Sequence, residues 1–257
     1  MSWFETVFLS LIEGLTEFLP VSSTGHLILS SAMFGIQENQ FVKSFNIIIQ
    51  FGAILAVLFL YWRRFMPNLV FYKKILTAFL PAAIIGLAIK SKIDLILGSV
   101  YVVAVSLIIG GIILIWTDRK FDSLSINGKK TDDLTLIECL KLGFIQCLAF
   151  IPGVSRSGAT IVGGLFMGMN RKEAAEFSFF LAVPTLSGAA FVKTLGIIKT
   201  IQQSEIIYLV AGTILSFVFA LAAIRFFINL VGSYGYKHFG YYRIILGLCV
   251  LLFSLMN

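Results

Sequence analysis

The stretch Glu13-Gly-Leu-Thr-Glu-Phe-Leu-Pro-Val-Ser-Ser-Thr-Gly-His26 places two carboxylates, a proline and a serine-rich turn inside an otherwise apolar stretch. A second polar stretch, Pro152-Gly-Val-Ser-Arg-Ser-Gly-Ala-Thr160, breaks the apolar sequence again in the other half of the chain. At membrane depth, such polar backbone survives only where protein or a watery cavity satisfies it. Most of the remaining chain is apolar, so these two breaks decide how it folds.

The composition is that of an integral membrane protein. Of the 257 residues, 58% are hydrophobic and only 13% are charged, and the mean hydropathy is +0.96. Soluble proteins carry roughly a quarter charged residues, and a bilayer crossing needs about 20 mostly apolar ones. A buried helix of a soluble protein would explain one apolar run but not six. The predicted spans are Phe41–Trp62, Ile75–Ile89 with its flanks, Leu95–Trp116, Ala174–Val192, Ile206–Ile224 and Phe239–Met256.

Other features of the composition exclude several classes of protein. The start of the chain lacks the basic region of a cleavable signal peptide, and Glu13 and Glu17 interrupt its apolar stretch. Cys139, Cys147 and Cys249 have no metal-ligand spacing, which predicts buried thiols. The net charge of +7 fits basic cytoplasmic loops. No basic run with interleaved aromatic residues points to nucleic acid, so none is expected as a partner.

The order of features repeats on either side of a charged linker, within one integral membrane domain. Repeat 1 covers about residues 1–117, the linker 118–133, and repeat 2 about residues 134–257. Gly14-Leu-Thr-Glu17 corresponds to Gly143-Phe-Ile-Gln146 at an offset of 129 residues, and Pro20 to Pro152 at an offset of 132. This alignment pairs Glu17 with Gln146 and Thr24 with Arg156. The repeated order indicates a duplication.

The segments around each break are too short and too polar to span a bilayer. Short, Pro/Gly-interrupted segments in corresponding halves are typical of broken or re-entrant helices that meet at a central site. Each half then holds one re-entrant pair and three full spans, and the odd number inverts the second half relative to the first. The predicted fold is therefore all-α, with six full spans and two re-entrant pairs in two inverted-topology repeats. The re-entrant segments are Trp3–Leu19, Ser22–Phe34, Leu134–Phe150 and Ser155–Met169.

Charge bias predicts the orientation, because basic loops stay in the cytoplasm. The basic residues predicted on that side are Arg63, Arg64, Lys73, Lys74, Arg119, Lys120, Lys129, Lys130, Arg171, Lys172 and Lys237. Few lie on the opposite side, namely Lys43, Lys90, Lys92 and Lys199. Both termini are then expected outside.

The first break carries acid, base and hydroxyl groups. Glu13 and Glu17 lie one helical turn apart on one face, where they could chelate a divalent cation or share a proton. Pro20 ends the helix, and a hydroxyl then caps the next one, from Ser22, Ser23 or Thr24. His26 follows in its first turn, where it could exchange a proton with a neighbouring serine. The simpler interpretation makes the hydroxyls ordinary caps and the histidine a structural residue.

The second break resembles an anion cradle. Gly153 and Gly158 free the backbone, and Ser155 caps a helix start. Arg156 in that first turn opposes the helix dipole, a placement that suits a bound anion held by N–H groups, hydroxyls and guanidinium together. The alternative is that Arg156 pairs with Glu13 or Glu17, and the two interpretations are compatible. Together the breaks favour phosphoryl chemistry.

At these residues the sequence resembles the undecaprenyl-diphosphate phosphatase family, membrane enzymes associated with bacitracin resistance. The resemblance covers almost the whole chain and is most specific in Glu13–His26 and Pro152–Thr160, with Phe45–Phe65 similar to the family's next span. It implies hydrolysis of undecaprenyl diphosphate to the monophosphate and inorganic phosphate, which recycles the lipid carrier for cell-wall synthesis. It also implies a bacterial inner-membrane location, a site facing the periplasm or exterior, and a divalent cation, Mg²⁺ or Ca²⁺.

The resemblance also implies residue roles. Ser23 matches the family's proposed nucleophile, His26 its essential histidine and Arg156 its phosphate-binding arginine. Glu13 and Glu17 match a pair tied to metal binding or base function, and either Glu17 or His26 would take the nucleophile's proton. The expected substrate-binding residues are Arg156, Ser155, Ser157, Thr160, Ser22, Thr24 and Gly153. Expected partners are the lipid substrate and membrane lipids, with a homodimer as a possible assembly.

The leading alternative is a lipid flippase or anion transporter, because inverted repeats with broken helices are also the layout of secondary transporters. Both functions need Arg156 and helix N-termini around a phosphate. Transport needs no nucleophile, so Ser23, His26 and the paired glutamates favour the enzyme. A purely structural membrane subunit would not explain the buried charges.

Overall fold

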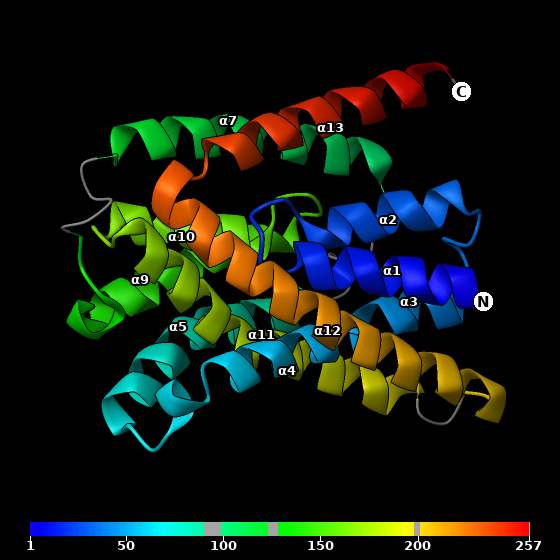
Figure 1. The fold of residues 1–257 in the computed structure, drawn as a ribbon, viewed down its shortest axis with the longest axis horizontal. Coiled ribbons are helices and arrows are strands. Elements are labelled where there is room, and N and C mark those ends of the chain that lie inside the picture. Colours follow the sequence, from blue (N-terminus) through cyan, green and yellow to red (C-terminus); the bar gives the residue numbers. More distant parts are fainter. Residues whose placement is uncertain (90–98, 123–127, 198–200, 257) are drawn as a thin grey trace.

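The computed structural model describes residues 1–89, 99–122, 128–197 and 201–256, and this part of the chain is helical (Figure 1). The longer helices are α1 (Trp3–Thr16), α2 (Ser23–Met33), α3 (Gln40–Ile48), α4 (Gln50–Leu60), α5 (Leu69–Ala88), α7 (Val100–Lys120), α9 (Leu136–Gln146), α10 (Arg156–Phe166), α11 (Arg171–Ile197), α12 (Gln203–Tyr234) and α13 (Lys237–Met256). Short 3₁₀ helices are η1 (Trp62–Phe65), η2 (Thr131–Asp133) and η3 (Cys147–Phe150). The all-helical prediction is confirmed.

Five helical segments of the described residues are long and apolar enough to cross a membrane, so the chain is a polytopic membrane protein. They are Gln40–Leu60, Leu69–Ala88, Val100–Lys120, Arg171–Val192 and Gln203–Tyr234. The sixth predicted span coincides with α13, which is not among the five. The first residues of the predicted span Leu95–Trp116 lie outside the described residues.

Two predicted spans differ from the structure in detail. The first long span is not one helix, because α3 ends at Ile48 and α4 begins at Gln50. At this break the Gly52 N–H donates to the Ile49 carbonyl at 3.0 Å, one residue tighter than an α-helical bond. The span predicted to end at Ile224 continues to Tyr234, because Arg225 is a good helix former and does not end a helix.

The helices around the two breaks are too short to span a bilayer. Helix α1 has 14 residues, and α2, α9 and α10 have 11 each, against the roughly 20 that a crossing needs. Helix α1 packs on α12, and α9 packs on α5, so the first helix of each half contacts a long helix of the other half. Helices α7 and α13 lie side by side (Figure 1). The two halves are therefore interleaved.

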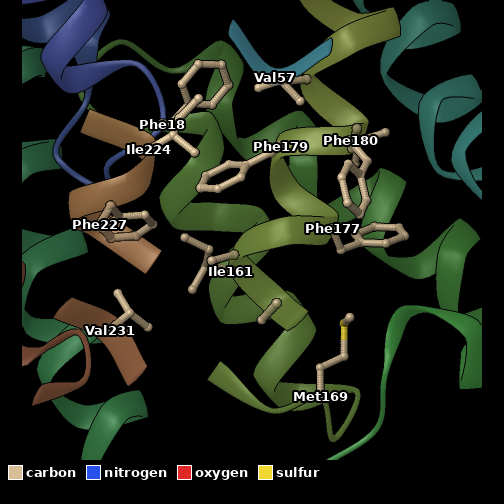
Figure 2. Close-up of a cluster of buried hydrophobic side chains, with 14 of the residues drawn as sticks. Phe18, Val57, Ile161, Met169, Phe177, Phe179, Phe180, Ile224, Phe227 and Val231 are labelled. Carbon is tan, nitrogen blue, oxygen red and sulfur yellow. The ribbon is translucent and has the colours of Figure 1, made fainter. Parts of the chain in front are cut away.

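An aromatic core supports both breaks (Figure 2). Phe179 of α11 packs edge to face against Phe18 of the first break, with ring centroids 5.2 Å apart. The Arg156 guanidinium lies 5.9 Å from the centroid of the Phe18 ring, within cation–π range. Ile161 of α10 is buried in the same cluster. Both breaks are thus packed against the hydrophobic core.

The charged linker forms ion pairs and hydrogen bonds with basic residues near the starts of α5 and α11. Arg64 pairs with Asp132 at 2.5 Å, and this hydrogen bond lowers the pKa of the Asp132 carboxyl. Lys74 donates to the main-chain carbonyl of Asp132 at 2.5 Å. Arg171 pairs with Asp118 at 2.7 Å. These contacts bring three basic residues, Arg64, Lys74 and Arg171, against the charged linker. Three lysines of the opposite side lie outside the described residues, namely Lys90, Lys92 and Lys199.

Candidate active site

Each break contains a serine whose backbone φ is positive. Ser22 and Ser155 have φ of 71° and 74°, and they are the two non-glycine residues with positive φ among the described residues. The Ser22 hydroxyl accepts from the Gly25 N–H at 3.3 Å, and the Ser155 hydroxyl accepts from the Gly158 N–H at 3.0 Å. Both serines therefore cap a helix; the sequence predicted Ser155 and left the first cap open among Ser22, Ser23 and Thr24. Non-glycine residues in this region are strained, and such strain gathers at functional sites.

The two matching caps align the breaks at an offset one residue longer than that of the two prolines. Because Ser22 corresponds to Ser155, the first helical residues also correspond, and these are Ser23 of α2 and Arg156 of α10. The sequence offset had instead paired Arg156 with Thr24, which is exposed. The prolines and the caps thus give alignments that differ by one residue.

One carboxylate joins the two breaks. Glu17 accepts a hydrogen bond from the Arg156 guanidinium at 2.8 Å on one oxygen, and a short hydrogen bond from the Ser23 hydroxyl on the other. The ion pair is almost fully buried. Hydrogen bonds thus connect the candidate nucleophile Ser23, the candidate base Glu17 and the candidate phosphate-binding residue Arg156.

The Arg156 side chain is fixed by a residue that sequence analysis missed. Its second terminal nitrogen donates to the Ser178 carbonyl at 2.8 Å and contacts the Ser178 hydroxyl at 3.2 Å. The Thr160 hydroxyl lies 2.8 Å from that same hydroxyl. Ser178 sits in the middle of the apolar α11 run, where one serine gives no sequence signal. It aims the guanidinium toward Glu17.

The other hydroxyls of the second break are bound within the protein. The Ser157 hydroxyl donates to the Leu19 carbonyl at 2.7 Å and lies 3.0 Å from the Ser155 hydroxyl. Thr160 bonds back to the Arg156 carbonyl at 2.9 Å. Ser157 therefore joins the second break to the first, Thr160 links the start of α10 to α11, and Ser155 lies at a cavity wall.

Glu13 is fully buried one turn before Glu17 on α1. Both of its carboxylate oxygens lack a hydrogen-bond partner within the described part of the chain. A buried carboxylate is costly unless it is protonated, paired or bound to a cation. The orphaned oxygens thus fit a proton or a cation ligand. No cluster of three or more His, Cys, Asp or Glu side chains occurs among the described residues, so protein carboxylates would supply only part of a metal's coordination.

The two ring nitrogens of His26 are hydrogen-bonded to groups other than Ser23. Its Nδ1 lies 2.7 Å from the Ser22 carbonyl, which can only accept, so Nδ1 carries a proton. Its Nε2 lies 2.7 Å from the Tyr242 hydroxyl of α13. The two rings are parallel within 5°. Tyr242 is 216 residues away in the sequence, and for that reason sequence analysis missed it.

Arg243, the next residue on α13, clamps both breaks. Its side chain is 1% exposed, and it donates at 2.9–3.3 Å to five main-chain carbonyls, those of Pro20, Ser106, Leu107, Gly153 and Val154. Gly110 leaves room for it, because an added Cβ there would lie 2.1 Å from a guanidinium nitrogen. An arginine inside an apolar span is a signal that the sequence analysis passed over.

Replacing Arg243 by methionine should destabilise the protein and slow its reaction. Five main-chain carbonyls would lose this donor, at about 1–3 kcal/mol for each buried one left unsatisfied. We expect a lower thermal midpoint in detergent and at least roughly a tenfold loss of turnover from the loosened breaks. The exposed Arg119→Met on α7 is the matched control. An Arg243→Met protein with wild-type melting and turnover would refute the clamp.

A cavity of about 310 Å³ lies where the breaks meet. Its polar wall carries Glu17, Ser22, Ser23, Thr24, Gly153, Ser155 and Arg156, and its apolar wall includes Ala82, Ala149, Phe150, Ile151, Leu186 and Ala189. Glu13, His26, Ser157 and Thr160 support this wall without lining the cavity. The cavity combines anion-binding groups with an apolar side.

The comparison with known proteins agrees with this geometry. The family described as "Bacitracin resistance protein BacA" matches residues 6–249. The chain belongs to this family. An undecaprenyl-diphosphatase of Bdellovibrio bacteriovorus is 57% identical over 252 residues, covering 98% of this chain and 96% of that protein. Proteins of the same name from Flavobacterium psychrophilum and Aquifex aeolicus are 48% and 44% identical, and the alignments cover 98% and 99% of this chain and 96% and 100% of those proteins.

Proposed function

We propose that this chain hydrolyses undecaprenyl diphosphate to undecaprenyl phosphate and inorganic phosphate, and so recycles the lipid carrier of bacterial cell-wall synthesis. The observation that carries the proposal is the buried chain Ser23–Glu17–Arg156 at the cavity wall. It unites an activated hydroxyl with an anion-binding cation. The names of the relatives support the substrate.

The cavity suits a molecule with a charged head and an apolar tail. Arg156 and the N-terminus of α10 bind the terminal phosphate, since a helix N-terminus and a guanidinium both favour an anion. Ser22, Thr24, Ser155 and Gly153 line the same wall and complete the polar contacts. The first isoprene units lie against the apolar wall.

In the proposed reaction the Ser23 oxygen attacks the terminal phosphorus, and the bond between that phosphorus and the bridging oxygen breaks. Undecaprenyl phosphate leaves, and Ser23 carries the phosphoryl group. Water then attacks the phosphoserine, which releases inorganic phosphate and restores the hydroxyl. Arg156 neutralises charge on the equatorial oxygens during both steps.

Glu17, rather than His26, takes the Ser23 proton in this proposal. The Ser23 hydroxyl already donates to Glu17, whereas both nitrogens of His26 are engaged with Ser22 and Tyr242. His26 then acts as a positioning residue that fixes the turn through the Ser22 carbonyl. These contacts support Glu17 over His26, a choice that the sequence leaves open.

A divalent cation, Mg²⁺ or Ca²⁺, is part of the proposal. Glu13 and Glu17 would hold it, with the remaining ligands supplied by substrate phosphates and water, as is usual for Mg²⁺. When bound, it supplies charge neutralisation for the diphosphate. The unpartnered oxygens of Glu13 support the assignment.

We infer the six-span, inverted-repeat layout from the paired contacts. The packing of α1 on α12 mirrors that of α9 on α5, and α7 packs on its counterpart α13. The matched caps Ser22 and Ser155 add a second correspondence. In this layout α13 is the sixth span, and the boundaries stay near 1–117 and 134–257. A homodimer stays a prediction.

The cavity is proposed to open to the periplasmic or extracellular face of the inner membrane. Ala82 lies 13 residues beyond the start of α5, which is about 20 Å along the helix, and Ala189 lies about 27 Å beyond the start of α11. Both helices start at the end with the basic loops. The cavity thus lies in the half of the bundle away from the basic loops, which supports an opening on the side opposite the cytoplasm.

Phosphate release by the purified protein in detergent tests the function. Detergent abolishes vectorial transport and leaves hydrolysis measurable. We expect release from a polyprenyl diphosphate, loss of release with EDTA, and recovery when Mg²⁺ or Ca²⁺ is added in excess. A pure protein that releases no phosphate with any divalent cation would overturn the proposal and favour the flippase or transporter.

A further inference from the structure

Gln146 is the last residue of α9, and its side chain is unsatisfied at the cavity. It is 1% exposed and lines the same cavity as Glu17, Ser23 and Arg156. Its Oε1 lies 3.2 Å from the Thr185 hydroxyl. Its Nε2 has no hydrogen-bond partner within the residues that the structure describes.

An unpaired buried amide is a costly feature. Native proteins satisfy nearly all buried polar groups, and each exception calls for a cause such as a bound ligand. The Thr185 hydroxyl has one proton and also lies 2.8 Å from the Leu181 carbonyl, so it does not by itself lock the amide of Gln146. An anion in the cavity would select the orientation in which the amide nitrogen of Gln146 faces the cavity, because only the N–H group can donate to an anion.

The charges on the cavity wall indicate which part of a diphosphate Gln146 can bind. Arg156 is the sole cationic side chain on the described cavity wall, and the proposed reaction uses it for the terminal phosphate. A diphosphate brings a second phosphate into the same 310 Å³, and that group needs its own donor. The Gln146 amide nitrogen is a neutral donor that has no partner in the described part of the chain.

The duplication explains why this residue is an amide. Gln146 corresponds to Glu17 in the repeat alignment, and both line the cavity. One copy has a carboxylate that accepts from Ser23 and Arg156. A second carboxylate facing the diphosphate would repel it, whereas an amide of the same shape donates to it.

We propose that Gln146, held by Thr185, binds the phosphate that stays on the lipid. This inference rests on the proposed function. It divides the cavity into two phosphate positions, with Arg156 at the phosphate that is transferred and Gln146 at the one that is retained. The product isoprenyl monophosphate carries only the retained phosphate, and inorganic phosphate is the transferred one.

The test compares inhibition by the two products. Purified wild type, Gln146→Met, Gln146→Glu and the exposed control Gln203→Met are assayed for phosphate release from polyprenyl diphosphate. Gln146→Met should raise KM and the inhibition constant for isoprenyl monophosphate by roughly ten- to a hundredfold, since it removes one hydrogen bond to a charged group. The inhibition constant for inorganic phosphate should not change. Gln146→Glu keeps the shape of the side chain, and it should raise KM and the monophosphate inhibition constant further because its carboxylate repels the phosphate.

Three results would contradict the inference. Gln146→Met and Gln146→Glu with wild-type KM and wild-type monophosphate inhibition would remove Gln146 from the site. An equal rise of both inhibition constants would mean a general disturbance of the cavity. A wild-type protein that releases no phosphate overturns the proposed function, and this inference with it, whereas an active wild type with unchanged variants overturns this inference alone. Thermal midpoints in detergent confirm that each variant is folded.

Discussion

Ser23→Ala should lower the turnover number at least roughly a thousandfold while binding of the diphosphate persists. The substitution removes the hydroxyl that donates to Glu17, and loss of a nucleophile leaves only the residual rate that binding and charge stabilisation provide. It removes one oxygen from a helix whose cap is the neighbouring Ser22, so the fold should persist. The measurement is the initial rate of phosphate release at saturating polyprenyl diphosphate.

Ser30→Ala is the matched control for Ser23→Ala. Ser30 is also buried on α2 and does not line the cavity, so its loss should leave turnover near wild type. If Ser23→Ala kept more than about a tenth of the wild-type rate, the nucleophile assignment would be wrong. Attack by water activated at Glu17 would then replace it.

Arg156→Ala should cost about a thousandfold in kcat/KM, and Arg156→Lys about a hundredfold, the scale of losing phosphate clamps and preorganised donors. The guanidinium contacts Glu17 and Ser178 at once, which an ammonium on a flexible stem does not reproduce. The alanine variant also leaves Glu17 buried without its cation. Breaking a buried pair costs about 3–5 kcal/mol.

Because Arg156→Ala can lose stability as well as activity, Arg156→Lys decides the interpretation. We expect the lysine variant to melt near wild type and still to bind inorganic phosphate weakly. The exposed Arg225→Lys on α12 is the control. Wild-type kcat/KM in Arg156→Lys would exclude a forked contact with phosphate, and wild-type kcat/KM in Arg156→Ala would exclude any role in binding.

The membrane fold could be predicted from sequence because it depends on composition and on local signals. Long apolar runs, the proline at each break and the capping serines are features of a few neighbouring residues. The break at Ile49 lies between Asn46 and Gln50, polar residues that the assignment of Phe41–Trp62 to one span overlooked. Helix α12 continues past the predicted end at Ile224 because Arg225 is a good helix former and does not end a helix.

The site could be predicted only as a set of residues, because its contacts join distant parts of the chain. The link from Glu17 to Arg156 spans 139 residues, and that from Arg243 to Pro20 spans 223. Motif spacing names the members of such a pair and gives no distance between them. The correspondence of Arg156 with Ser23 was hidden by a one-residue shift, visible only from the backbone angles of the two caps. The positions of the caps therefore carried more information than the sequence offset.

The stereochemical course at phosphorus tests the central claim most directly. The measurement uses a polyprenyl diphosphate whose terminal phosphorus is chiral through sulfur and isotopic oxygen, hydrolysed in isotopically labelled water. Each in-line displacement inverts the phosphorus, so attack by Ser23 followed by water gives overall retention. Retention is the predicted result, whatever the lifetime of the phosphoserine. Inversion would show a single attack by water and would contradict the account.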